Sequence, residues 1–174
     1  RNIETILVVL HPEDQNRLTD PAIKTALGGA TRNQSVYNGL RALRAAAPKQ
    51  VLIHDVARPL ISAKCITDVI EALQTHSGAA PALPITDALW RGQDGLVYKT
   101  VARENLFRAQ TPQGFDFQSI LQAHAQACGT AADDVEVAMQ AGLDVKIIAG
   151  HEENIKITLP EDFERASKIM KDQR

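Results

Sequence analysis

Short apolar runs alternate along the chain with longer stretches in which apolar residues recur every three or four positions. Residues 5–10 and 51–54 form apolar runs with little internal alternation, and weaker runs of the same kind span residues 79–83 and 145–149. Runs of this kind are typical of strands that are buried on both faces of a helix-covered sheet. The pattern therefore predicts strands at these positions.

The stretches that follow the runs predict helices. After Thr31, which is positioned to cap a helix, Val36, Leu40 and Leu43 fall on one stripe. Further helices are expected to begin at Ser62, Asp116, Asp133 and Pro160, with Gly142 ending the fourth. The alternation predicts an α/β fold over residues 1–174: a single domain built on an open, mostly parallel sheet with right-handed crossovers.

Residues 87–109 interrupt this alternation. The stretch Gly92-Gln-Asp-Gly95 lies between two extended-looking segments, which predicts an inserted β-hairpin. The hairpin carries more apolar side chains than a lone exposed hairpin needs, namely Leu89, Trp90, Val97, Tyr98 and Val101. An apolar patch of this kind indicates a surface for a partner.

The composition is that of a soluble globular protein and argues against nucleic-acid binding. Hydrophobic residues make up 44% of the chain and aromatic residues 4%, and the formal net charge is -2. Duplex binders need a basic face, and single-strand binders need aromatic platforms. Cys65 and Cys128 form no CxxC pair, and no long apolar run or signal peptide is present. We expect a cytoplasmic protein that does not enter a membrane.

Residues that follow strands are the candidates for chemistry, because ligands of open α/β sheets bind at the carboxyl ends of the strands. Asp55 follows the second predicted strand and could coordinate a hard divalent cation such as Mg²⁺, which favours one or two carboxylates together with substrate phosphates. From its spacing alone, a loop or cap role is the simpler interpretation. Arg58 could serve the fold by bridging loop carbonyls.

Three further segments carry candidate ligand groups. Residues 28–35 place two glycines before a helix start that favours anions, although a plain turn before a capped helix is the simpler interpretation. Arg103 and Thr111 could hold a phosphate, or Arg103 could belong to a solvated hairpin base. In the alternating segment 154–158, Lys156 could bind a phosphate from the inner face of a strand end, or guard an edge strand.

Other constellations point to structure rather than catalysis. Asp133 and Asp134 pair two acids at a helix start, where complementing the helix dipole is a sufficient role. The chain has no GxSxG motif, and neither cysteine has a plausible histidine partner. A Rossmann dehydrogenase is also disfavoured, because no GxGxxG follows a strand.

Taken together, six segments resemble the 2-C-methyl-D-erythritol 4-phosphate cytidylyltransferase family. They occur in the family's order and spacing: GGATRNQSV, VLIHDVARP, ALPITDAL, VARENLFRAQTPQGF, ADDVEVA and ENIKITLPEDF. The resemblance implies a three-layer α/β/α nucleotidyltransferase (Rossmann-like) fold. It also implies transfer of the cytidylyl group of CTP to the polyol phosphate with Mg²⁺, in non-mevalonate isoprenoid biosynthesis.

The resemblance also implies roles for matched residues. Gly29 and Ser35 would contact the cytosine, with Ala30 supplying backbone in the same loop, and Asp55, Val56 and Ala57 would line the ribose and phosphate side. Arg32 and Arg58 are also expected to be substrate-binding residues. Asp55 would also lie near the metal. Arg103 and Lys156 would position the acceptor phosphate catalytically, with Thr111 beside them. Because the family's arm embraces a second subunit, the segment 87–109 implies a homodimer in which Arg103 acts in the partner's site.

The chain departs from the family in two places. Family members begin with a strand and a glycine-rich loop that grips the CTP triphosphate, and no segment here matches that loop. We expect this loop to precede Arg1 in the complete protein. Ala132 stands where the family commonly has a threonine. The alternatives that stay open are a ribitol-phosphate cytidylyltransferase and a non-catalytic nucleotide-binding module, and a fusion to a cyclodiphosphate synthase domain is also possible.

Overall fold

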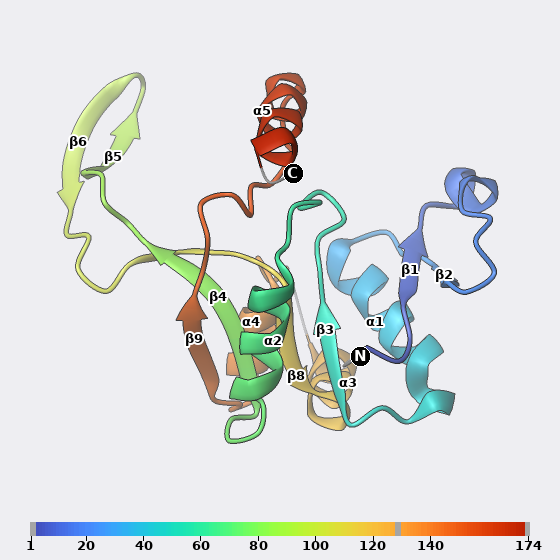
Figure 1. Cartoon of the computed structure of the whole chain (residues 1–174). Coiled ribbons are helices and arrows are strands. Elements are labelled where there is room, and N and C mark those ends of the chain that lie inside the picture. Colours follow the sequence, from blue (N-terminus) through green and yellow to red (C-terminus); the bar gives the residue numbers. More distant parts are fainter. Residues whose placement is uncertain (1–2, 128–129, 173–174) are drawn as a thin grey trace.

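The computed structural model describes residues 3–127 and 130–172, so Cys128 lies outside the described residues. Figure 1 shows the arrangement of its elements. The helices are α1 (Arg32–Leu43), α2 (Ala63–Ala72), α3 (Phe117–Gln126), α4 (Asp134–Gln140) and α5 (Pro160–Asp172), with short 3-10 turns η1 (Pro12–Arg17) and η2 (Arg44–Ala46). The strands are β1 (Leu7–Leu10), β2 (Lys24–Leu27), β3 (Gln50–Ile53), β4 (Gly78–Pro84), β5 (Leu89–Gln93), β6 (Leu96–Val101), β7 (Phe107–Ala109), β8 (Gln113–Asp116) and β9 (Val145–Ala149).

The helices begin where the capping residues predict. Thr31 Oγ1 accepts a hydrogen bond of 3.1 Å from a backbone N–H in the first turn of α1, and Ser62 caps α2 at the same distance. Asp116 and Asp133 cap α3 and α4 in the same way. Each cap satisfies an N–H group that has no partner within the helix, which is why a polar residue marks each start.

The central sheet is mixed, so the expectation of a mostly parallel sheet is wrong. Its order is β3-β8-β4-β7, and β9 also pairs with β4. Strand β8 runs antiparallel to both β3 and β4, β7 runs antiparallel to β4, and β9 runs parallel to β4. A parallel return needs a crossover, usually a helix. No helix lies between β4 and β8, so after the hairpin the chain runs back along β4.

Helices cover both faces of this sheet. Figure 1 shows α2 in front of the strands and α3 and α4 behind them. On the α2 face, Val69, Leu73 and Ala79 form a buried cluster. A larger cluster packs behind, consisting of Leu40, Val51, Phe115, Phe117, Ile120, Ala123, Val137 and Ala138. Burial of these side chains on two faces fixes the end of β3 and the start of β8, where the site lies.

Gly114 in β8 allows α2 to approach the sheet closely. A Cβ atom at Gly114 would lie 2.4 Å from Val69 Cγ1 and 2.9 Å from Leu73 Cδ1, both in or beside α2. The next residue, Phe115, faces the opposite cluster and is fully buried. The alternation along one short strand therefore serves both layers of the core.

Strands β5 and β6 form the hairpin that the sequence predicts. Within the part of the chain that the structure describes, they pair only with each other, antiparallel. The turn between them places Asp94 and Gly95 at φ values of 51° and 80°. Two-residue turns with positive φ at both positions match the twist of a hairpin. Figure 1 shows the hairpin projecting away from the central sheet. Residues 107–109 of the predicted arm instead form β7 of the main sheet.

The segment 154–158 is not the strand that its alternation predicts. It joins no sheet, and Ile157 donates one backbone hydrogen bond of 2.8 Å to Ala57 O. Asn154 and Ile155 are both buried, whereas Lys156 is exposed, so Asn154 and Lys156 do not share one environment. Among the described helices, none has the length and apolar content needed to span a membrane.

Candidate active site

The candidate site is built around Asp55, in the loop that follows β3. The Asp55 side chain is 18% exposed and its Oδ2 lies 3.0 Å from Lys156 Nζ. Arg58 Nε lies 3.7 Å from the same oxygen, and Arg32 approaches the other oxygen, Oδ1, at 3.9 Å. Three cations from separate segments thus converge on one carboxylate. This arrangement goes well beyond the loop or cap role that spacing alone favours.

A ring of hydrogen bonds holds the Asp55 loop. The backbone N–H of Asp55 donates to Thr111 Oγ1 at 3.1 Å, Thr111 Oγ1 lies 2.9 Å from His54 Nδ1, and His54 Nε2 lies 3.0 Å from Arg58 O. A carbonyl oxygen only accepts, so His54 Nε2 carries the proton and Nδ1 of the neutral ring accepts from the Thr111 hydroxyl. Burial lowers the pKa of His54, which favours this neutral form.

This ring changes the expected role of Thr111. The structure places Thr111 beside Asp55, where a phosphate ligand is predicted, but its hydroxyl already donates to one neighbour and accepts from another. His54 was missed as a functional residue, although the HDVARP motif contains it. Its contribution depends on a threonine 57 positions away, a contact that the sequence does not reveal.

Arg58 bridges loop carbonyls, as the sequence suggests. Its guanidinium donates to Asn154 O at 2.7 Å and to Ala109 O at 3.3 Å, and burial lowers its pKa. Asn154 Nδ2 in turn donates to Thr111 O at 2.9 Å. These bonds tie the turn after β3 to the segment that carries Lys156. The Lys156 ammonium is therefore brought to Asp55 by loop packing rather than by a strand.

The loop before α1 is organised by its own polar groups. The Gly29 N–H donates to Ser35 Oγ at 3.0 Å, and the Ser35 hydroxyl donates to Thr31 O at 2.9 Å. A Cβ atom at Gly29 would lie 2.1 Å from Gln34 Cγ, so a side chain does not fit there without rearrangement. Gly29 and Ala30 are exposed. Their backbone remains accessible to a ligand, and contact with cytosine stays a prediction.

Arg103 is not brought to this site within one chain. It lies at the foot of the hairpin and donates to the Thr86 carbonyl oxygen, and Figure 1 shows the hairpin well apart from the end of β3. Val56 is highly exposed beside Asp55, and Ala57 is partly covered. Arg108 lies in β7 and pairs with Glu152 at 2.6 Å, and both side chains are exposed.

The two acids at the start of α4 have different roles. Asp133 caps the helix, as expected, and accepts from Gln113 Nε2 at 2.9 Å. Asp134 is fully buried and contacts Arg32 at 2.6 Å and His124 at 3.1 Å. Burial acts to raise the pKa of Asp134, but the hydrogen bonds from His124 and Arg32 outweigh it and hold this pKa below its ordinary value. This buried cluster was not predicted from the sequence.

The Arg32 guanidinium responds to the same contacts. Burial acts to lower the pKa of Arg32, and the hydrogen bond and charge of Asp134 outweigh it, so the pKa is raised. Arg32 therefore remains charged beside the site at any physiological pH. A permanent cation in this position suits an anionic ligand.

The donor set around Asp55 fits Mg²⁺ only in combination with a substrate. Within residues 3–127 and 130–172, no group of three or more His, Cys, Asp or Glu side chains converges as a metal site. Mg²⁺ commonly binds one or two carboxylates and completes its coordination with water and substrate phosphates. The single carboxylate of Asp55 meets this requirement for a nucleotide complex, and metal binding stays a prediction.

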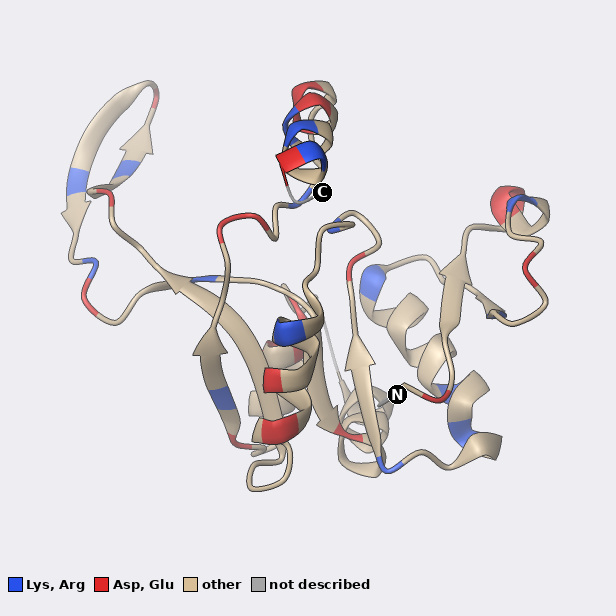
Figure 2. Cartoon of the chain, in the orientation of Figure 1, with Lys and Arg blue, Asp and Glu red and all other residues tan. Residues whose placement is uncertain are grey.

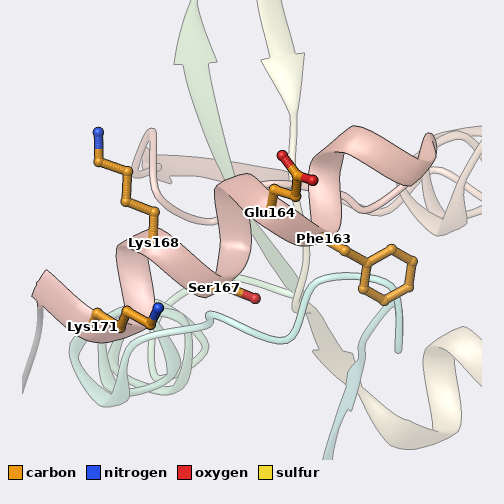
Figure 3. Close-up of a pocket in the computed structure, with 5 residues that line it drawn as sticks. All are labelled: Phe163, Glu164, Ser167, Lys168 and Lys171. Atoms are coloured by element: carbon orange, nitrogen blue, oxygen red, sulfur yellow. The ribbon is translucent and has the colours of Figure 1, made fainter.

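Neither Asp55 nor Lys156 lines the hollow along α5 or the hollow beside β4 and β9. A hollow of about 370 Å³ lies along α5 and is lined by Phe163, Glu164, Ser167, Lys168 and Lys171. Figure 3 shows these side chains projecting from a single helix, which makes the hollow an exposed groove. Figure 2 shows that α5 carries charges of both signs. The geometry of the Asp55 cluster, and not cavity size, therefore identifies the candidate site.

Comparison with known proteins identifies the family. The family model described as "IspD: 2-C-methyl-D-erythritol 4-phosphate cytidylyltransferase" matches residues 1–172. The chain belongs to this family. The family predicted from the sequence motifs is thereby confirmed.

Curated relatives of the cytidylyltransferase family occur in two forms. The chain is 54% identical over 172 residues to the "Bifunctional enzyme IspD/IspF" of Rhodobacter capsulatus, covering 97% of this chain and 45% of that protein. It is 48% identical over 174 residues to the 2-C-methyl-D-erythritol 4-phosphate cytidylyltransferase of Cereibacter sphaeroides, covering 97% of this chain and 77% of that protein. The chain thus spans less than half the length of the bifunctional relative.

A solved cytidylyltransferase structure confirms the α/β fold. The crystal structure of the Thermus thermophilus enzyme superposes with a TM-score of 0.88 at 34% identity, covering 98% of this chain and 84% of that chain. The mixed sheet is therefore compatible with this enzyme fold. The family and the residue cluster around Asp55 together support a catalytic interpretation of the site.

Proposed function

We propose that the complete protein transfers the cytidylyl group of CTP to 2-C-methyl-D-erythritol 4-phosphate, releasing pyrophosphate and 4-diphosphocytidyl-2-C-methyl-D-erythritol. The observation that carries this proposal is the pairing of Asp55 with Lys156 at 3.0 Å, at the end of β3, in a chain of the cytidylyltransferase family. The Lys156 side chain is 46% exposed, so its ammonium retains N–H groups for a substrate phosphate.

The residues of this chain bind and orient; they do not attack. The acceptor phosphate is already ionised near neutral pH, so its oxygen attacks the α-phosphorus of CTP without a protein nucleophile or a strong general base. Lys156 neutralises the acceptor phosphate, and Asp55 fixes the Lys156 ammonium by the ion pair described above. When bound at Asp55, Mg²⁺ would supply charge neutralisation of the nucleotide phosphates.

The proposal includes a homodimer in which the segment 87–109 forms the arm. Trp90, Leu96, Val97 and Tyr98 are exposed large hydrophobic residues on β5 and β6. Their exposure supports burial against a second copy of the chain. Arg103 lies at the base of this hairpin, away from Asp55 of its own chain, so we infer that it serves the acceptor phosphate in the partner's site.

A mixing experiment tests the roles of Arg103 and Lys156 together. Arg103→Ala and Lys156→Ala should each abolish use of the acceptor while CTP binding is retained. If Arg103 acts across the dimer, mixed heterodimers regain one intact site, and a random equimolar mixture should recover about a quarter of the wild-type activity. A mixture as inactive as its components would contradict the cross-subunit role. Deletion of residues 89–101 should give a monomer by light scattering, and an unchanged dimer would refute the arm.

Two features of the complete protein remain part of the proposal. We place the reaction in the cytoplasm, in line with the expectation from the sequence. Bifunctional relatives contain the matching region as 45% of their length, so fusion to a cyclodiphosphate synthase domain is one expected form of the protein. The intact mass of the natural protein, compared with the 18.9 kDa of this chain, distinguishes the two forms.

A further inference from the structure

Asp134 makes a bidentate ion pair that the helix start does not require. Its Oδ1 and Oδ2 accept from Arg32 Nη1 at 3.2 Å and from Arg32 Nη2 at 2.6 Å. On the other side, His124 Nε2 lies 3.1 Å from Oδ1. The backbone N–H of Asp134 donates to Gln113 Oε1 at 3.1 Å. Residues of α1 and α3 thus hold the Asp134 carboxylate, and Gln113 of β8 holds the Asp134 backbone.

The burial of Asp134 needs an explanation beyond capping. The neighbouring Asp133 already caps α4, and a first-turn acid that only complements the helix dipole does not need to be buried. Asp134 is instead fully buried, and the side chain of His124 is 1% exposed. A buried carboxylate is costly unless it is paired and hydrogen-bonded. Besides the buried His124, its side-chain partner is the partly exposed cation Arg32.

Arg32 stands between Asp134 and the candidate active site. Its side chain is 36% exposed, and its Nη2 lies 3.9 Å from Asp55 Oδ1, beyond hydrogen-bonding distance. A guanidinium has five N–H donors, and the Asp134 contacts use one on each terminal nitrogen. The Arg32 side chain therefore retains donors for a ligand, while its bonds to Asp134 hold it 3.9 Å from the Asp55 carboxylate.

We propose that Asp134 is a positioning residue for the nucleotide: it holds the Arg32 guanidinium at the edge of the site, so that the remaining N–H groups bind an anionic oxygen of CTP. This inference rests on the proposed function, because it takes CTP as the nucleotide. Arg32 lies in the first turn of α1, directly after the loop at residues 28–31 that is expected to contact cytosine. The nucleotide, and not the acceptor, is therefore the expected ligand.

The test is a double-mutant cycle on the complete protein, read out as CTP affinity by calorimetry. Asp134→Asn and Arg32→Gln should each weaken CTP binding by about tenfold, the effect of losing one charge-assisted contact. The double variant should bind CTP no more weakly than Arg32→Gln alone, because Asp134 acts through Arg32. The KM for the acceptor should stay unchanged in all three. The proposal would be overturned if the double variant lost CTP affinity by the product of the two single fold-losses, or if Asp134→Asn bound CTP with wild-type affinity.

Asp133→Asn is the matched control. It makes the same substitution one residue earlier, retains a good capping side chain, and does not touch Arg32 in any hydrogen bond of the described residues. It should leave CTP affinity unchanged, and a tenfold loss there would show that any disturbance of α4 suffices. If Asp134→Asn fails to fold, Asp134→Glu replaces it. That variant keeps the charge but shifts the guanidinium, and unchanged CTP affinity would overturn the proposal.

Pyrophosphate release measured in parallel separates this inference from the proposed function. Wild-type protein that binds CTP but releases no pyrophosphate with any acceptor would contradict the proposed function, and the affinity cycle would still decide the role of Asp134. Wild-type protein that binds no CTP would overturn both.

Discussion

Replacing Thr111 by valine removes the hydroxyl at the centre of the ring that holds the Asp55 loop. Thr111 is 4% exposed, and valine has nearly the same shape, so packing is preserved. The Asp55 N–H and His54 Nδ1 both lose their partner. Leaving a buried group unpaired costs about 1–3 kcal/mol. Water can reach the half-buried Asp55 loop, so we expect a total loss of about 2 kcal/mol, which lowers the melting temperature by roughly 4–8 °C.

The assay combines thermal unfolding with steady-state kinetics. Because the Asp55 loop also places Lys156, Thr111→Val should lower kcat/KM for both substrates along with the melting temperature. Thr111→Ser is the control: it keeps the hydroxyl, loses one buried methyl, and should retain most of the activity. If Thr111 were only a ligand of the acceptor phosphate, valine would raise the acceptor KM alone and leave stability unchanged. That result would refute the reasoning from the hydrogen-bond ring.

Two further predictions concern stability. Burial acts to raise the pKa of Asp134, but hydrogen bonds from His124 and Arg32 hold it low, and a depressed native pKa stabilises the fold above the unfolded-state pKa. Asp134→Asn should therefore lower the free energy of unfolding by about 3 kcal/mol at neutral pH. In urea unfolding, this difference in stability from wild type should shrink as acid protonates Asp134. A difference that does not depend on pH would contradict this. Gly114→Ala should lower the free energy of unfolding by about 2 kcal/mol by overpacking against Val69, whose Cγ1 lies 2.4 Å from the new Cβ. The double variant Gly114→Ala with Val69→Ala should lose less stability than the sum of the two single losses. Additive losses would show that the contact with Val69 is not responsible.

Local signals predicted most of the fold. The helix starts at Thr31, Ser62, Asp116 and Asp133 are confirmed because capping is a short-range interaction written in a few adjacent residues. The direction of β8 was not predicted. It depends on how the chain returns after the hairpin, and the short sequence Gln-Gly-Phe-Asp at residues 113–116 carries little strand signal.

The site was predicted in part. Asp55, Arg58 and Lys156 were named from motifs, and the structure brings them together. The strand assigned to residues 154–158 was wrong because alternation there reflects loop packing, with the buried Asn154 bonded to the segment before β8. The contacts of His54 with Thr111 and of Asp134 with Arg32 were not predicted, because these partners lie 57 and 102 positions away and no local pattern encodes such contacts.

Pyrophosphate release from CTP and Mg²⁺ by the complete protein tests the central claim most directly. The reaction is run with 2-C-methyl-D-erythritol 4-phosphate and, separately, with ribitol phosphate. The proposed function predicts release with methylerythritol phosphate and little with ribitol phosphate. Faster release with ribitol phosphate would assign a different acceptor to the same site, and CTP binding without release from either acceptor would contradict the enzymatic assignment.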